Sequence, residues 1–222
     1  MKLIVAGATG YVAGEVIRQA VWMPEITTIV ALARRPVELD RPESSKIESV
    51  IIKDYGEYLD QVKKALAGSD ACIWAVAVTP TKSKLMDVAD VKRVCHDYTI
   101  AGLQAMYEAG PAKPFRFLYM SGYMSQRDPS KKPFLLGDYA VMRGNVENHV
   151  MAFAKNHDGI EACVAKPGLM ARAGSAYNFI LKSTGVVPIA SVEEVSRAIL
   201  KQVVSGFEKE VLENSDFARL GA

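Results

Sequence analysis

A glycine-rich turn near the N-terminus limits what this chain can fold into more than any other feature. Leu3 to Ala6 form a short apolar run that ends at Gly7-Ala8-Thr9-Gly10. Beyond the turn, apolar residues recur at the spacing of one helix face: Val12, Val16, Ile17, Ala20 and Val21. The order strand, glycine turn, helix is typical of the start of a βαβ unit, so the pattern predicts a parallel sheet.

The rest of the chain continues this alternation of strands and helices. Apolar runs predict further strands at Ile26 to Ala33, Val50 to Ile52, Ala71 to Val78, Phe115 to Met120 and Ile160 to Ala165. Helical periodicity predicts helices around 59–68, from 79 to about 109, over 138–156, and after a capping box at Ser191. The sequence therefore predicts an α/β fold with a doubly wound parallel sheet, a Rossmann fold. We expect residues 1–222 to form a single domain, with a small substrate cap built from the loops after the fifth and sixth strands.

The small residues in the first turn are spaced to suit nucleotide binding. Gly7 permits a tight turn, Gly10 lets the backbone approach a pyrophosphate, and Ala13 allows the helix to pack closely on the strand. The helix N-terminus then offers unpaired N–H groups to the phosphates. A simple tight turn also needs glycines, but the position directly after the first strand favours nucleotide binding. We expect cofactor contacts from this turn: Gly7, Thr9, Gly10, Tyr11 and Val12.

The end of the second strand indicates which nucleotide binds. A site specific for NAD carries Asp or Glu there to accept hydrogen bonds from the ribose hydroxyls. This chain has Arg34 and Arg35, whose guanidinium groups can hold a 2′-phosphate by charge-assisted bonds. The sequence therefore favours NADP(H), unless the two arginines only solubilise a loop. We expect further cofactor contacts from Asp54, Ala75, Val76 and Pro167.

Seven segments together resemble the short-chain dehydrogenase/reductase superfamily. In chain order they are GATGYVAGEVI, ALARRP, ACIWAVAV, DYTIAGLQAMYEAG, FRFLYMSG, YAVMRGNVE and VAKPG. The chain is similar to atypical, extended-type members, among them the TIP30-like and NmrA-like group, over nearly its whole length. The resemblance implies an NAD(P)-binding protein and indicates no particular substrate.

The resemblance also implies a catalytic site, which this chain matches in part. The superfamily's catalytic tyrosine corresponds to Tyr139, and the position of its lysine, four residues later, is occupied by Arg143. The superfamily's serine corresponds to Ser121, at the end of the fifth strand, or to Ser125, because the loop leading to Tyr139 is long. The pair Pro167-Gly168 matches the turn that flanks the nicotinamide.

Arg143 changes the chemistry that such a site can support. In a reductase of the superfamily, the tyrosine donates a proton to the substrate carbonyl while the cofactor donates hydride. The lysine stabilises tyrosinate, binds the nicotinamide ribose and relays protons. An arginine can supply the charge and the hydrogen bonds, but it does not release its proton at ordinary pH. The substitution is compatible with cofactor binding and counts against efficient hydride chemistry.

Composition and charge exclude several classes of protein. The net charge is +2 without a basic stripe, so we expect no nucleic-acid partner. Three cysteines without CxxC spacing and three histidines without ligand spacing argue against a disulfide framework and against a metal site. The N-terminus does not resemble a secretory signal, and no segment is long enough to cross a membrane, so we expect a cytoplasmic protein.

Three functions are compatible with these features. The first is an NADP(H)-dependent oxidoreductase that acts on a carbonyl or alcohol, with Tyr139 as general acid. The second is a non-redox catalyst, such as an isomerase, dehydratase or cyclase, in which Tyr139 and Arg143 act on the substrate. The third is a module that senses NADP(H) and binds another protein through the apolar loop 122–137. Apolar side chains near the expected pocket predict a small, largely apolar ligand: Tyr123, Met124, Phe134, Met170, Tyr177 and Phe179.

Overall fold

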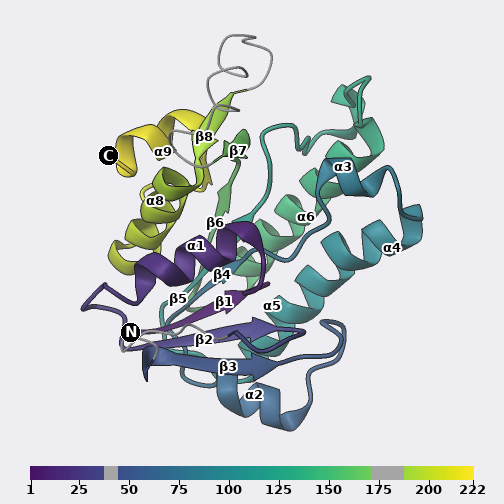
Figure 1. The fold of residues 1–222 in the computed structure, drawn as a ribbon. Helices are drawn as coiled ribbons and strands as arrows, with labels where there is room; N and C mark the ends of the chain where they lie inside the picture. The colour runs from purple at the N-terminus through teal and green to yellow at the C-terminus, as the bar shows by residue number, and fades with distance from the viewer. Residues whose placement is uncertain (38–44, 172–187) are drawn as a thin grey trace.

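A parallel sheet of seven strands forms the centre of the computed structural model, which describes residues 1–37, 45–171 and 188–222 (Figure 1). In spatial order the strands are β3 (Ile47–Ile51), β2 (Thr28–Ala33), β1 (Lys2–Ala6), β4 (Ala71–Trp74), β5 (Phe115–Met120), β6 (Ile160–Ala165) and β9 (Val211–Leu212). The strand order reverses between β1 and β4, where such sheets bind ligands beyond their carboxyl ends. The predicted doubly wound Rossmann fold is confirmed.

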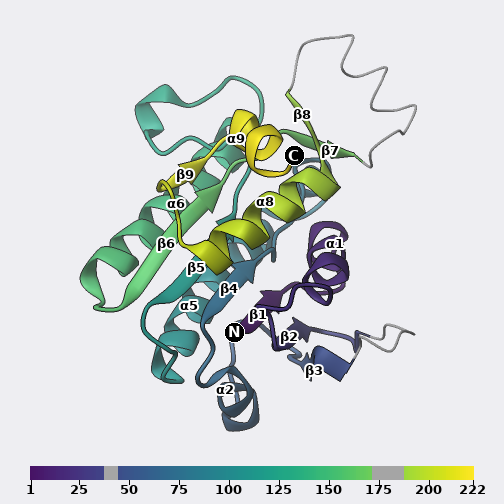
Figure 2. The same cartoon turned by 90° about the vertical axis from the view of Figure 1, so that its left-hand side faces the viewer.

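Helices cover both faces of this sheet (Figure 2). One face carries α1 (Tyr11–Ala20) and α8 (Val192–Ser205), with α9 (Asn214–Leu220) packed beside α8. The other face carries α2 (Asp60–Leu66), α5 (Tyr98–Glu108) and α6 (Gly137–Asn156). Short elements complete the described chain: α3 (Pro80–Ser83), α4 (Val88–Lys92), a π-helical turn at Arg93–Asp97, a 3₁₀ turn at Pro129–Lys131, and the paired strands β7 (Leu169–Ala171) and β8 (Ile189–Ser191). None of the described helices is both long and apolar enough to span a bilayer.

Strand β4 shows why the central apolar runs have no polar side. Ala71 and Ile73 pack into the hydrophobic layer under α1 and α8, whereas Cys72 and Trp74 pack into the layer under α2, α5 and α6. A strand covered on both faces must be apolar at every position. Gly102 in α5 allows this close packing, because a Cβ there would lie 2.4 Å from the Trp74 ring.

The structure departs from the sequence prediction mainly between β4 and α5. The single helix expected from residue 79 to about 109 is divided into α3, α4, the π-helical turn and α5. Thr79 caps α3 with its side chain, and α4 starts anew after Asp87. Strand β3 begins at Ile47 rather than Val50, because an edge strand with exposed side chains has no apolar run to mark it. Strands β7, β8 and β9 and helix α9 were not predicted, since two or three strand residues carry no periodicity.

Candidate functional site

The glycine turn after β1 lies directly against the carboxyl end of β4. Gly7 has a φ of 78°, a conformation that glycine adopts without strain. A Cβ on Gly7 would lie 3.1 Å from the backbone carbonyl of Ala75. The Gly10 N–H donates to the Gly7 carbonyl at 2.8 Å, which closes the turn. The structure thus brings together two segments that were predicted separately to bind the cofactor.

Helix α1 begins immediately after this turn, with Gly10 as its N-cap. Gly10 contributes no side-chain cap to the first-turn N–H groups, and no acidic residue lies in the first turn. The start of the helix therefore combines a partial positive charge with backbone donors, which suits a phosphate. The backbone can approach a ligand closely at Gly7 and Gly10. This cradle fits the pyrophosphate of a dinucleotide.

Tyr55 forms a hydrogen bond with the glycine turn and was not predicted from the sequence to be part of the site. Its hydroxyl accepts a hydrogen bond from the Gly7 N–H at 3.1 Å and donates to the Leu32 carbonyl at 2.8 Å. Tyr55 is 4 % exposed, and burial raises the pKa of its hydroxyl to about 12. The phenol therefore stays protonated and keeps its donor. Its position after an edge strand gave no sequence signal for this role.

The residues predicted to choose between NADP and NAD lie just beyond the carboxyl end of β2. Arg34 and Arg35 follow β2 directly, and both side chains are exposed. Within the described part of the chain, neither forms an ion pair or a side-chain hydrogen bond. Asp54 is differently placed, because its carboxylate accepts from the Gly56 N–H at 2.8 Å and pairs with Arg93 at 3.1 Å. Hydrogen bonds from Gly56 and Tyr98, together with Arg93, lower the pKa of Asp54, and its cofactor contact stays a prediction.

Tyr139 reaches the carboxyl end of β4 from the first turn of α6. Its hydroxyl donates to the Val78 carbonyl at 2.7 Å. The ring packs against a small cluster that includes Val78, Val91 and Cys95. Burial raises the pKa of Tyr139, and the positive charge of Arg143 opposes this shift only in part. Tyr139 is therefore a protonated donor close to the segment that touches the glycine turn.

Arg143 lies one helical turn further along α6 and is 3 % exposed. Its Nη2 donates to the Met120 carbonyl at 2.5 Å, and its guanidinium stacks over the Tyr119 ring at 5.1 Å. Its Nε is buried without a hydrogen-bond partner, and within the described residues no carboxylate pairs with the group. A permanent charge is therefore held next to Tyr139 by a carbonyl, an aromatic ring and the neighbouring Cys95, without a carboxylate among the described residues.

Cys95 is a second residue that the sequence did not identify as part of the site. It lies in the π-helical turn, a distortion that often marks functional sites in helices. Its Sγ accepts from the Val78 N–H at 3.2 Å, so both Cys95 and Tyr139 hold the backbone of Val78. The thiol is fully buried, as are those of Cys72 and Cys163.

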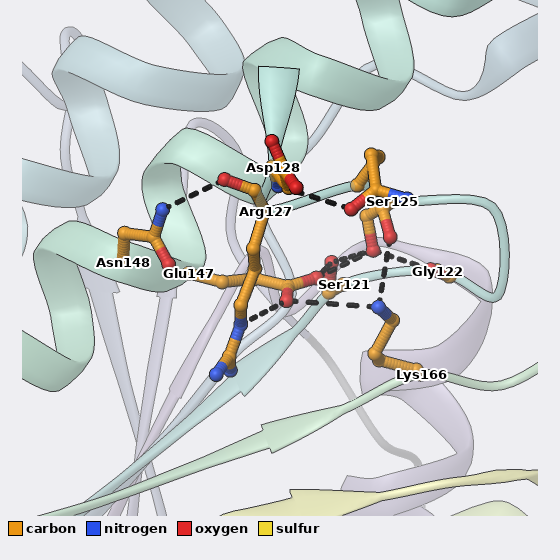
Figure 3. A network of polar contacts seen from close by, with 9 residues as sticks. Ser121, Gly122, Ser125, Arg127, Asp128, Glu147, Asn148 and Lys166 are labelled. Carbon is orange, nitrogen blue, oxygen red and sulfur yellow. Dashed lines mark hydrogen bonds and ion pairs between the residues drawn. The ribbon is translucent and has the colours of Figure 1, made fainter. Parts of the chain in front are cut away.

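Both candidate serines contact one buried carboxylate, that of Glu147 (Figure 3). The Ser121 and Ser125 hydroxyls each lie 2.5 Å from Glu147 Oε1, and 2.8 Å from each other. Arg127 Nε donates to Glu147 Oε2 at 2.7 Å, and Lys166 Nζ lies 3.7 Å from the same oxygen. Four-residue intervals in the sequence put Tyr139, Arg143 and Glu147 on one helix face, but they do not predict this network.

The loop after β5 fits against α6 because of Gly144. A Cβ there would lie 2.0 Å from the Gln126 carbonyl oxygen, so the loop backbone rests directly on the helix. The Gln126 N–H donates to the Ala140 carbonyl at 2.9 Å, which fixes the contact. The Tyr123 N–H donates to the Pro167 carbonyl at 2.9 Å, so the predicted nicotinamide-flanking turn is joined to the same loop.

Comparison with known proteins agrees with this geometry. The profile of the NAD(P)H-binding family matches residues 7–203. The chain belongs to this family. The match begins at the first glycine of the turn and extends through α6 and most of α8, so it includes the described residues of the candidate site. A search of curated proteins found no match.

Solved structures share the fold of this NAD(P)H-binding protein at low sequence identity. DesIV, a dTDP-glucose 4,6-dehydratase from Streptomyces venezuelae, has a TM-score of 0.71 and 14 % identity, over 96 % of this chain and 75 % of DesIV. The PhqB reductase domain from Penicillium fellutanum has a TM-score of 0.71 and 17 % identity, over 96 % and 66 %. A UDP-N-acetylglucosamine 4-epimerase from Methanobrevibacter ruminantium has a TM-score of 0.70 and 12 % identity, over 96 % and 75 %. The predicted resemblance to atypical, extended-type short-chain dehydrogenases/reductases is confirmed, and these structures support the fold alone.

The predicted substrate cap is described only in part. Tyr177 and Phe179 lie outside the described residues. Three of the other predicted apolar residues lie on the loop between β5 and α6. The side chain of Phe134 is fully exposed, that of Tyr123 is about half-exposed, and that of Met124 is somewhat less exposed. The described residues contain no group of three His, Cys, Asp or Glu side chains that could hold a metal ion.

Proposed function

We propose that this protein is an NADP(H)-dependent oxidoreductase that reduces a carbonyl group of a small, largely apolar substrate. The observation that carries the proposal is the position of the Tyr139 hydroxyl, 2.7 Å from the carbonyl of Val78. Val78 follows Ala75, whose backbone touches the glycine turn. A proton donor and a phosphate cradle therefore both contact the segment 75–78, beyond the carboxyl end of β4.

Each side chain of the site has a role in this proposal. The turn from Gly7 to Gly10 and the start of α1 bind the pyrophosphate, and Arg34 with Arg35 bind the 2′-phosphate. Bound NADPH would supply the hydride. Tyr139 releases its bond to Val78 and donates its proton to the substrate oxygen. Arg143 stabilises the tyrosinate that remains, and solvent returns the proton because an arginine cannot.

The residues at the rim support an apolar substrate. Phe134 and Leu135 lie on the loop before α6 with their side chains largely in solvent, as do Leu85, after α3, and Val88, at the start of α4. Exposed apolar groups around a crevice are typical of sites that bury an apolar ligand. We assign to this rim the recognition of the substrate rather than of the cofactor.

The arginine pair provides the first test of the cofactor. NADPH and NADH are titrated against the wild type and against the variant Arg34→Ala/Arg35→Ala, with nicotinamide fluorescence as the readout. A charge-assisted hydrogen bond contributes about 1.5–3 kcal/mol, so the variant should lose NADPH affinity by roughly ten- to a hundredfold. Its affinity for NADH should change little, because NADH lacks the 2′-phosphate.

The control variant for this test also removes two positive charges, but at other positions in the chain. Arg18→Ala/Arg219→Ala replaces two exposed arginines whose surface ion pairs, with Glu15 and Glu208, contribute little to stability. This variant should bind NADPH as the wild type does. If both double variants weakened NADPH equally, the preference would arise from overall charge; if the wild type bound neither nucleotide, the proposed function would be wrong.

The pH dependence of turnover tests Tyr139 as the acid. Tyr139 can donate a proton only as the phenol, and burial raises its pKa above the ordinary tyrosine value of about 10. A raised pKa keeps the phenol present as pH rises, so carbonyl reduction should stay constant from about pH 7 to about pH 9. Alcohol oxidation needs tyrosinate and should rise over the same range. A reduction rate that falls within this range would identify a different acid.

A non-redox proton-transfer catalyst is the second candidate, and Arg143 is the observation that favours it. A buried permanent cation beside Tyr139 can stabilise an enolate or a similar anion without any hydride transfer. The two candidates differ in stoichiometry. A reductase consumes one equivalent of NADPH for each product molecule, whereas the non-redox catalyst forms product with no net change in nicotinamide absorbance.

A further inference from the structure

The carboxylate of Glu147 is the most completely enclosed charge in the described structure that has cationic partners. Its side chain is 0 % exposed. Its oxygens contact two hydroxyls, one guanidinium and one ammonium group, and these come from the residue after β5, from the following loop and from the residue after β6 (Figure 3). A buried carboxylate costs much desolvation free energy unless such partners surround it. The buried carboxylate therefore depends on these four partner groups, and it also holds them in place.

The two serine protons are both used inside this network. Ser121 can donate to Glu147 Oε1 or to Ser125 Oγ, at 2.5 and 2.8 Å. Ser125 can donate to Glu147 Oε1 or to the Gly122 carbonyl, each at 2.5 Å. Each hydroxyl has one proton, and every arrangement directs that proton to an internal acceptor. Neither serine then has a proton left to donate to a substrate carbonyl.

The network continues to the proposed acid through the backbone. Ser121 follows Met120, whose carbonyl accepts the 2.5 Å hydrogen bond from Arg143 Nη2. Arg143 in turn places its charge beside Tyr139. Two contacts fix Arg127 to α6. Its side chain donates to Glu147, and its backbone carbonyl accepts from the Asn148 side-chain amide at 3.1 Å. The Met120 carbonyl shares its peptide plane with the Ser121 N–H, so a shift of Ser121 would tilt the acceptor that orients Arg143.

We propose that Glu147 is a positioning residue, which locks the segment 121–128 onto α6 and so sets Arg143 and Tyr139 for proton donation. Ser121 and Ser125 serve as its hydrogen-bond donors and do not touch the substrate. The proposal rests on the proposed carbonyl reduction for its effect on turnover. The structural part of the proposal, that Glu147 locks the segment 121–128 onto α6, does not depend on that function.

The test compares Glu147→Gln with Ser121→Ala and Ser125→Ala. Readouts are NADPH affinity, kcat for reduction of 4-nitrobenzaldehyde, and amide hydrogen exchange of residues 121–128 by mass spectrometry. Glutamine presents N–H groups to Arg127 and Lys166, so exchange should accelerate and kcat should fall by about a hundredfold, as displacement of catalytic groups typically causes. Each serine variant should lower kcat by less than about fivefold, because Glu147 keeps the other serine hydroxyl and both cationic partners. NADPH affinity should change by less than about threefold in all three, since the glycine turn lies elsewhere.

Controls and a second variant keep the result interpretable. Glu161→Gln and Ser205→Ala make the same chemical changes at exposed positions away from the segment 121–128 and should change none of the readouts. If Glu147→Gln fails to fold, Arg127→Met weakens the same contact from a side chain that is 32 % exposed, and it should accelerate exchange in the same segment.

Two results would overturn the proposal. One is a loss of about a hundredfold in kcat for either serine variant with exchange unchanged, since that pattern is expected of a serine that contacts the substrate. The other is unchanged exchange in both Glu147→Gln and Arg127→Met. A wild type that binds NADPH but reduces no carbonyl would count against the proposed function, and the exchange measurement would then decide the role of Glu147.

Discussion

Replacement of Tyr139 by phenylalanine should remove carbonyl reduction while NADPH still binds. The substitution deletes only the hydroxyl, which is the proposed proton donor, and keeps the ring that packs against Val78, Val91 and Cys95. General acid catalysis typically contributes about 10²- to 10⁴-fold, so kcat should fall by that factor. NADPH affinity should remain near that of the wild type, because the proposed phosphate contacts come from the glycine turn. The decrease is measured as single-turnover oxidation of bound NADPH by nicotinamide absorbance.

Stability measurements distinguish the chemical role of Tyr139 from its packing role. The variant loses the 2.7 Å hydrogen bond to Val78, which should cost about 1 kcal/mol of unfolding free energy. Tyr107→Phe on α5 is the matched control, since its ring contacts Phe153 and His157 on the outer surface. It should keep full activity. If Tyr139→Phe also kept full activity, Tyr139 would be a packing residue, and the proton would come from another group.

The sheet could be predicted from the sequence because a strand buried on both faces leaves a clear mark. Ala71 to Trp74 contribute alternately to the two hydrophobic layers, and so the run contains no polar residue. The same reasoning placed β3 too late, because its exposed side chains at Glu48, Ser49 and Ile51 are those of an edge strand. Apolar periodicity reports burial, and it fails where a strand is not buried.

The spacing of the candidate site residues on α6 could be predicted, but their contacts could not. Four-residue intervals put Tyr139, Arg143 and Glu147 on one face of α6 from the sequence alone. Their partners come from β4, β5 and β6, which only the folded sheet brings together. Gly144 was the available signal, since a glycine within a helix costs stability and suggests a close backbone approach. The structure places the Gln126 carbonyl against it.

Replacement of Gly7 by alanine should abolish useful NADPH binding. Alanine at a φ of 78° is strained, and its Cβ would lie 3.1 Å from the Ala75 carbonyl group. Strain of this kind costs about 1–3 kcal/mol, and relief would require the turn to move away from β4. Since the phosphates depend on the backbone of this turn, NADPH affinity should fall by roughly ten- to a hundredfold or more in a fluorescence titration.

Gly14→Ala is the matched control, because it lies in the same glycine-containing segment but without the same constraint. No atom lies within 4 Å of a Cβ at Gly14, and the residue is exposed inside α1. Alanine is favoured over glycine in a helix by about 1 kcal/mol, so this variant should be slightly more stable and bind NADPH normally. The contrast matters because both changes add one methyl group. Equal affinity in the two variants would mean that the turn bends freely away from β4, and the phosphates would then have to be held by side chains such as Arg34 rather than by the backbone at Gly7.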